Sequence, residues 1–140
     1  MGLNFSETIR NARLQAVITE LDTGDDGVLP TAYMEFYDNP RPSAGAAITT
    51  ETLIGTVAFS EPSGTISAGV LTFDTITDDL LADADADIGW ARAYDSGGVW
   101  QMDMGCGLVG SGQEILFNTL TARIGGVIKI LSGSFTEGNS

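Results

Sequence analysis

The sequence predicts a mainly β protein, a β-sandwich of jelly-roll-like type with one N-terminal α-helix, and three observations lead to this fold class. A helical period of apolar residues is confined to the first twenty or so residues. Beyond them, β-branched and aromatic residues alternate with polar ones in short runs. Gly, Pro, Asn and Asp separate these runs at spacings of roughly 8 to 15 residues, which is typical of a sandwich of about seven or eight strands.

A single domain is expected over residues 1–140, because the chain has no linker and no internal repeat. This domain consists of an N-terminal helix over about residues 4–22 and a β-sandwich over about residues 31–136. A chain of 140 residues can bury one hydrophobic core without the help of disulfides.

The N-terminal helix is predicted from an apolar face and from residues that can cap its ends. Asn4, with Glu7 three residues later, resembles a capping box, and Ser6 is the competing N-cap. Gly24 fits a left-handed C-terminal stop. The apolar face is formed by Leu14, Val17, Ile18 and Leu21.

The first strand is expected over residues 32–37, where apolar and polar side chains alternate, and Pro40 and Pro42 end it in a surface loop. The tetrapeptide Asp95-Ser96-Gly97-Gly98 predicts a hairpin turn, because its glycines can adopt positive φ. Further strands are predicted over residues 53–59, 66–73, 88–94, 99–104, 115–117 and 127–131, and a last one is allowed around Phe135.

The composition favours a structural or binding protein over an enzyme. The chain contains no histidine, one cysteine and six basic residues. Most Ser and Cys hydrolases need an imidazole to carry a proton, and many transition-metal sites use it as a ligand. We therefore expect no catalytic residues and no cofactor, and a carboxylate-only hydrolase is the one form of enzyme left open. Cys106, between two glycines, is expected to be a small buried filler.

The charge of the chain argues against nucleic-acid binding. Six basic and 19 acidic residues give a formal net charge of −13, and no basic residue occurs between Arg41 and Arg92. Contact with a phosphate backbone would meet repulsion instead of gaining from counterion release. The N-terminal sequence lacks the pattern of a signal peptide and no apolar run reaches the length of a membrane span, so we expect synthesis in a cytoplasm and no membrane contact.

Two short motifs match catalytic or nucleotide-binding patterns by their letters alone. Asp22-Thr23-Gly24 spells the aspartic-protease triplet, but here it falls at the end of the predicted helix. Residues 105–110 satisfy G-x-G-x-x-G, yet a turn and a strand follow where the dinucleotide fingerprint requires a helix. The glycines of this segment are better explained by bulges and tight reversals.

Three alternate carboxylates, Asp83, Asp85 and Asp87, are weak candidates for a calcium or magnesium site. The EF-hand pattern is excluded, because Ile88 stands where its glycine belongs and Tyr94 stands where its bidentate glutamate belongs. A solvated acidic loop between two strands is the simpler interpretation, and no metal is expected.

Trp90, Arg92 and Tyr94 lie on one face of a predicted strand whose other face carries only small residues. Two interpretations are open. The three side chains could form an exposed row, and these residue types are enriched in interface hot spots. Alternatively, the aromatic rings fill a wide core and Arg92 pairs with a carboxylate.

The last third of the chain resembles a group of small tailed-bacteriophage virion proteins, among them capsid decoration, or cement, proteins. The resemblance rests on residues 90–99, 110–112 and 126–130, that is, an arginine-bearing strand, a Gly turn, a short strand and a final strand that begins with glycine. The amphipathic opening helix, here residues 9–21, belongs to the same pattern.

This resemblance implies a homo-oligomer, dimer or trimer, on the virion surface, made in the host cytoplasm, that binds the outer lattice of the major capsid protein and reinforces the head. A tail or collar component remains an alternative, as does a carbohydrate-binding sandwich in which Trp90, Trp100 and Tyr94 stack on sugars. The expected partner-binding residues are Trp90, Arg92, Tyr94, Leu14, Val17 and Ile18.

Overall fold

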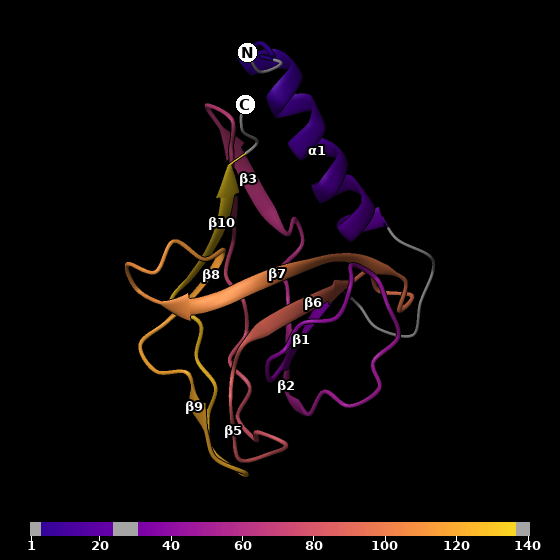
Figure 1. Ribbon diagram of the computed structural model, residues 1–140. Helices are drawn as coiled ribbons and strands as arrows, with labels where there is room; N and C mark the ends of the chain where they lie inside the picture. Colours follow the sequence, from indigo (N-terminus) through magenta and orange to yellow (C-terminus); the bar gives the residue numbers. More distant parts are fainter. Residues whose placement is uncertain (1–3, 24–30, 137–140) are drawn as a thin grey trace.

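The structure is a computed structural model that describes residues 4–23 and 31–136. Its described part contains one helix and ten strands (Figure 1). The elements are α1 (Glu7–Thr23), β1 (Tyr33–Tyr37), β2 (Leu53–Ala58), β3 (Gly64–Ser67), β4 (Val70–Phe73), β5 (Ala86–Asp87), β6 (Trp90–Tyr94), β7 (Trp100–Leu108), β8 (Ile115–Phe117), β9 (Thr121–Ala122) and β10 (Ser132–Thr136). The prediction of a mainly β fold with one N-terminal helix is confirmed.

Eight of the strands form one sheet, in the order β2-β1-β6-β7-β8-β10-β4-β3, and β5 pairs with β9 in a separate ribbon. All neighbours are antiparallel except β7 and β8, which run parallel. The sheet curls over its own core. Phe36 of β1 and Phe117 of β8 therefore meet edge to face, with ring centroids 5.4 Å apart. The first four strands of the sheet thus face the last four, as in a sandwich.

Helix α1 begins where a serine caps it. The backbone N–H of Ile9 donates to Ser6 Oγ at 3.2 Å, so the competing cap Ser6, rather than Asn4, satisfies this amide. The predicted stop at Gly24 lies outside the described residues. In Figure 1 the helix lies along one side of the molecule beside β3 and reaches β4 and β7. Its apolar face is buried against them through Leu14, Ile18 and Leu21.

Two predicted strands differ from the structure. Residues 66–73 were expected to form one strand, but they belong to a hairpin of β3 and β4 whose turn contains Ala68 with φ of 51° and Gly69 with φ of 77°. Residues 127–131 were expected to form a strand, but only Ile128 makes a bridge there, to Asp79, and the last strand is β10. The Asp95–Gly98 turn is confirmed, since Asp95 N–H donates to the carbonyl of Val99 at 3.0 Å.

Alternate side chains of the strands fill the core. Met34 and Phe36 point inward from β1, and Ile115 and Phe117 point inward from β8. Cys106 is buried as expected, and burial, followed by the nearby charge of Glu114, raises the pKa of its thiol. None of the helical residues that the structure describes forms a segment long and apolar enough to cross a bilayer.

Candidate functional site

The row of Trp90, Arg92 and Tyr94 lies on the face of β6 that points away from the main core. Across the sheet these residues pair with Tyr37, Glu35 and Tyr33 of β1. The row is not a free surface, because Trp90 is 1% and Arg92 4% exposed. The loop over residues 38–52 covers it: Trp90 Nε1 donates to the carbonyl of Asp38 at 2.9 Å, and Arg92 Nη1 donates to the carbonyl of Ala46 at 2.6 Å.

Arg92 forms a two-pronged ion pair with Asp103 of the neighbouring strand. Its Nε donates to Oδ1 at 2.7 Å and its Nη2 to Oδ2 at 3.1 Å. The hydrogen bonds that Arg92 donates to Asp103 raise the pKa of the guanidinium above its ordinary value. Burial alone would raise the pKa of Asp103, but donors from Arg92, the Gly45 amide and Trp100 outweigh it and hold that pKa below its usual range.

Aromatic stacking completes this covered layer. The rings of Tyr37 and Trp90 stack with centroids 5.0 Å apart, as do those of Tyr33 and Tyr94. The Tyr37 hydroxyl donates to the carboxylate of Glu35, and burial, with this hydrogen bond, raises the pKa of the phenol. The alternative interpretation, in which the rings pack inside and Arg92 pairs with a carboxylate, matches this arrangement. Contact of these side chains with a partner stays a prediction. For Trp90 and Arg92 it requires the covering loop to move, whereas Tyr94 is half-buried.

The three helix residues expected at a partner interface differ in their exposure. Leu14 and Ile18 are 0% and 5% exposed and pack into the core. Val17 is half-buried and lines a groove between the helix and the sheet. Of the six expected residues, Val17 is therefore the one that contributes to an open concave surface of the described chain.

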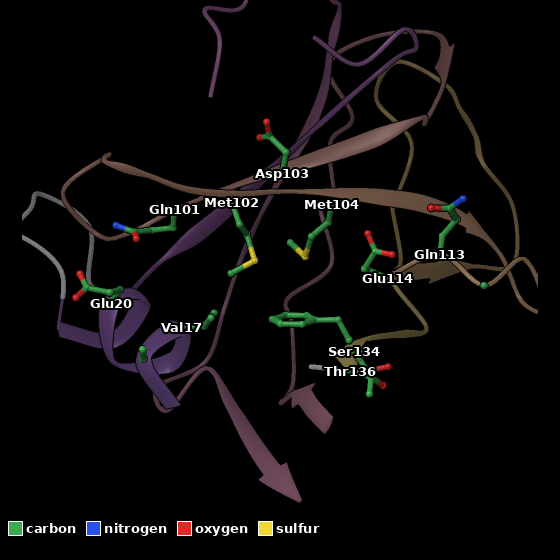
Figure 2. Close-up of a pocket in the computed structure, with 13 residues that line it drawn as sticks. Val17, Glu20, Gln101, Met102, Asp103, Met104, Gln113, Glu114, Ser134 and Thr136 are labelled. Atoms are coloured by element: carbon green, nitrogen blue, oxygen red, sulfur yellow. The ribbon is translucent and has the colours of Figure 1, made fainter. Parts of the chain in front are cut away.

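This groove, with a volume of about 910 Å³, lies between α1, β7 and β10 (Figure 2). Met102 and Met104 project from β7 toward Val17, whereas Asp103 between them points to the other side of the strand. Strand alternation places the two methionines on the same face, and Phe135 of β10 adds a ring to the floor. The polar residues of the lining are Glu20, Gln101, Asp103, Gln113, Glu114, Ser134 and Thr136.

The groove offers an apolar floor and an acidic, amide-rich rim. Glu114 is held in place, since its Oε1 accepts the N–H of Gly105 at 2.9 Å and its carbonyl accepts the N–H of Ser134 at 3.0 Å. The lining contains two glutamates and one aspartate, Asp103, and no lysine or arginine. Such a site suits an apolar side chain that is flanked by positive charge.

The glycine motif of residues 105–110 serves packing. It lies on β7 and its following turn, as expected, and not at the start of a helix. A Cβ at Gly105 would stand 2.0 Å from Gln113 Oε1, and one at Gly107 would stand 2.3 Å from Ser111 Oγ. Gly107 lets the loop over residues 111–113 lie directly on the strand, whereas the neighbour of Gly105 is the end of a side chain that can turn away.

Of the three acidic residues singled out by sequence, Asp85 and Asp87 have side chains engaged with backbone or hydroxyl groups, and Asp83 is exposed. Asp85 Oδ1 accepts the N–H of Ile124 at 2.7 Å, and Asp87 Oδ1 accepts the hydroxyl of Thr121 at 3.1 Å. Within residues 4–23 and 31–136, no group of three or more His, Cys, Asp or Glu side chains could hold a metal ion. Asp22 of the protease-like triplet accepts the N–H of Ser63 at 3.0 Å, and Gly24 lies outside the described residues.

Sequence reasoning missed the methionines and the ring that form the groove floor. The alternation of Met102 and Met104 along β7 is visible in the sequence, but their meeting with Val17 and Phe135 depends on how the helix and β10 pack. No protein-family model, curated protein or solved structure matches this chain, so the fold and the groove are the observations from which a function is proposed.

Proposed function

We propose that the protein is a structural protein of a bacteriophage virion, a capsid decoration (cement) protein that binds the outer lattice of the major capsid protein and reinforces the head. The observation that supports this proposal best is the groove between α1, β7 and β10. It presents apolar side chains on a rigid sheet and helix, in a concave shape that can receive a loop or arm of a neighbouring protein.

The floor of the groove has the properties of an adaptable protein-binding surface. Met102 is partly buried, flexible and polarizable, so it can adjust to a partner's side chain without losing contact area, whereas Met104 beside it is 2% exposed and belongs to the core. Phe135 supplies a rigid ring beside them. A lattice protein that inserts one apolar side chain here would find it surrounded by contacts on three sides.

The rim and the overall charge favour a partner with a basic surface. Glu20 and Glu114 stand at the groove, and the whole chain carries a formal charge of −13. A basic strip on the lattice would be attracted from a distance and oriented before contact. On the outside of a particle, the remaining acidic surface would keep virions from clumping.

The carbohydrate-binding alternative is less well supported by this geometry, because one of its three rings is buried. Trp90 is buried, and Trp100, although 41% exposed, lies against Gly45 and donates its Nε1 to Asp103 at 3.1 Å. Tyr94 is half-buried and is the cross-strand partner of Trp100, so two of the three rings remain near each other and Trp90 is the one that is withdrawn. A tail or collar component would use the same groove, and its location on the particle would distinguish it.

Reconstitution on capsids tests the decoration role. Purified wild-type protein, Met102→Glu and Leu108→Glu are each added to capsids that lack the protein, and binding and resistance to heat are measured. Leu108 lies on the same strand, is 47% exposed and does not line the groove, so it is the matched control. We expect wild type and Leu108→Glu to bind and to raise the temperature at which capsids open, and Met102→Glu not to bind.

Circular dichroism checks that each variant is folded, and Val17→Ser replaces Met102→Glu if the glutamate prevents folding. Capsids that are equally robust with and without the wild-type protein would refute the reinforcing role. Equal binding by the groove variants and the control would refute the assignment of the groove.

A further inference from the structure

The strand between β7 and β10 is too short to pair with the whole of either neighbour. β7 has nine residues and β8 has three, and β8 pairs with β7 only over residues 106–108. On its other side, β8 pairs with residues 132 and 133 of β10. In Figure 1, β8 lies beside only one end of the long strand β7. Within residues 4–23 and 31–136, no strand therefore pairs with this side of residues 100–105 of β7, an interval that we call the open strand position.

Main-chain groups of β7 face the open strand position. The N–H of Gly105 points to this side, since it donates to Oε1 of Glu114 at 2.9 Å. Cys106, the next residue, points the other way and donates its N–H to the carbonyl of Gly89 at 3.3 Å. Because main-chain groups alternate between the two edges of a strand, Asp103 directs its N–H and C=O to the same side as Gly105.

Main-chain groups of β10 face the same position from its other side. The N–H of Ser134 donates to the carbonyl of Glu114 at 3.0 Å, where the pairing with β8 ends. By the same alternation, Thr136 directs its N–H and C=O toward the open strand position, and Phe135 between them faces β4. Two strands thus present hydrogen-bonding groups to an interval that no described strand fills.

The open strand position coincides with the groove, whose lining includes residues 101–104 of β7, residues 112–114 before β8 and residues 134–136 of β10. Val17, Met102 and Phe135 are partly buried and pack against the core. Figure 2 shows Val17 on the helix and Met102 on the strand pointing toward each other. An extended segment in this position would place every second side chain on these three residues.

We infer that an extended segment of a partner protein binds here as an added strand between β7 and β10. The inference rests on the proposed function, because it concerns the same groove, and it states that the partner is held through its main chain. Strand addition gives affinity through main-chain hydrogen bonds and specificity through alternate side chains. Since Glu20 and Glu114 line the groove and no lysine or arginine does, the segment carries apolar residues at alternate positions and basic residues at its ends.

An added strand fits this position better than a helix. Where β8 is present, one strand already lies between β7 and β10 and pairs with both. A segment that continues the position of β8 extends both pairings without changing the strand order. An α-helix bonds its main-chain groups internally and would leave those of Asp103 and Thr136 unpaired.

Titration of the purified full chain with a synthetic peptide tests this inference. The probe alternates valine and threonine between terminal lysines, and its ends are acetylated and amidated. Wild type is expected to bind it. N-methyl groups on one central valine and one central threonine remove main-chain donors, so the dissociation constant is expected to rise about tenfold or more. The matched control carries its N-methyl groups on the terminal lysines, and its dissociation constant should stay within about threefold of that of the unmethylated peptide.

Thr136→Pro and Thr136→Ala separate the main chain of β10 from its side chain. Both variants lack the threonine hydroxyl, but only proline removes the N–H that faces the open strand position. Proline is tolerated here because this N–H belongs to the edge that β4 does not use. Thr136→Pro is expected to raise the dissociation constant of the peptide about tenfold and Thr136→Ala to leave it unchanged. Circular dichroism checks folding, and the methylated peptides test wild type alone if the proline variant does not fold.

Absence of binding up to about 1 mM peptide overturns the inference. Equal affinities for the two methylated peptides, or of the two Thr136 variants, also overturn it. So do wild-type dimers that the peptide dissociates, because a second copy would then fill the position.

The titration uses no capsids, so its failure differs from a failure of the proposed function. Capsid binding through the groove without peptide binding would remove only the added strand. Peptide binding by a chain that does not join capsids would remove only the decoration role.

Discussion

Arg92 and Asp103 face each other across β6 and β7 as a two-pronged ion pair, and each side chain is about 5% exposed. The same carboxylate also accepts the N–H of Gly45 at 3.1 Å and the Nε1 of Trp100 at 3.1 Å. It therefore joins the sheet to the loop that covers Trp90. The pair explains how a chain with an excess of carboxylates can bury an arginine beneath this loop.

Replacing Asp103 by alanine should strongly destabilise the fold. The guanidinium of Arg92 would stay buried without its counterion, and loss of one partner of a buried pair typically costs about 3 to 5 kcal/mol. Urea unfolding of wild type and variant measures this difference. Asp78→Asn, at an exposed carboxylate, is the control and should change stability by less than about 0.5 kcal/mol.

The double variant Arg92→Met with Asp103→Leu should recover about 2 kcal/mol or more of that loss, because no charge is then left unpaired. If Asp103→Ala costs less than about 1 kcal/mol, as an exposed ion pair would, the pair is not buried as described.

The stabilising effect of Asp103 should disappear in acid. Its pKa in the folded protein lies below the ordinary value of about 3.9, so its contribution is fully present above that pH and is lost as pH falls through the lowered folded value. The stability gap between wild type and Asp103→Ala is therefore expected to be constant from pH 7 to about pH 4 and to shrink below it. Urea midpoints across this range measure the gap. A gap that widens in acid would contradict the assigned hydrogen bonds.

Asp95 should prove essential to the hairpin between β6 and β7. It is 3% exposed, and its Oδ1 accepts the N–H groups of Gly97 and Val99 at 2.9 and 3.0 Å. Asp95→Ala leaves these donors without a partner and is expected to cost about 1 to 3 kcal/mol. Asp95→Asn keeps an oxygen at this position and should cost clearly less, as measured by urea unfolding. Equal losses in both variants would show that the carboxylate oxygen does not organise the turn.

Gly64 should tolerate alanine poorly, whereas Gly105 should tolerate it. A Cβ at Gly64 would stand 2.7 Å from the backbone carbonyl oxygen of Thr72, which the β3–β4 pairing holds in place, and overpacking of this kind costs about 1 to 3 kcal/mol. At Gly105 the contact is the end of the Gln113 side chain, which can turn away, so a change below about 1 kcal/mol is expected. Thermal unfolding compares the two variants. A larger loss at Gly105 would contradict this packing.

Local signals predicted the parts of the fold that short-range chemistry determines. The apolar period of Leu14, Ile18 and Leu21 places the helix, and the glycines after Asp95 place the hairpin turn. The β3–β4 turn was missed because Gly69 is its one glycine and Ala68, which also adopts positive φ, is not a residue typical of turns.

Long-range packing determines the features of the fold and of the site that local signals did not predict. Alternation puts Trp90 and Arg92 on one face of a strand but cannot say whether that face is covered, because the covering contact at Ala46 lies 46 residues from Arg92. The groove likewise depends on helix and strand packing that joins Val17 to Phe135, residues from opposite ends of the chain. No periodicity in the sequence predicts that residues so far apart in the chain line the same groove.

Cryo-electron microscopy of particles that carry the protein tests the central claim most directly, because it locates the chain and shows what fills its groove. The account predicts density for the β-rich body on the outer face of the head, with a segment of the major capsid protein between α1, β7 and β10, against Met102 and Met104. Density for the chain in the tail, or on the head with this groove empty and turned to solvent, would contradict it.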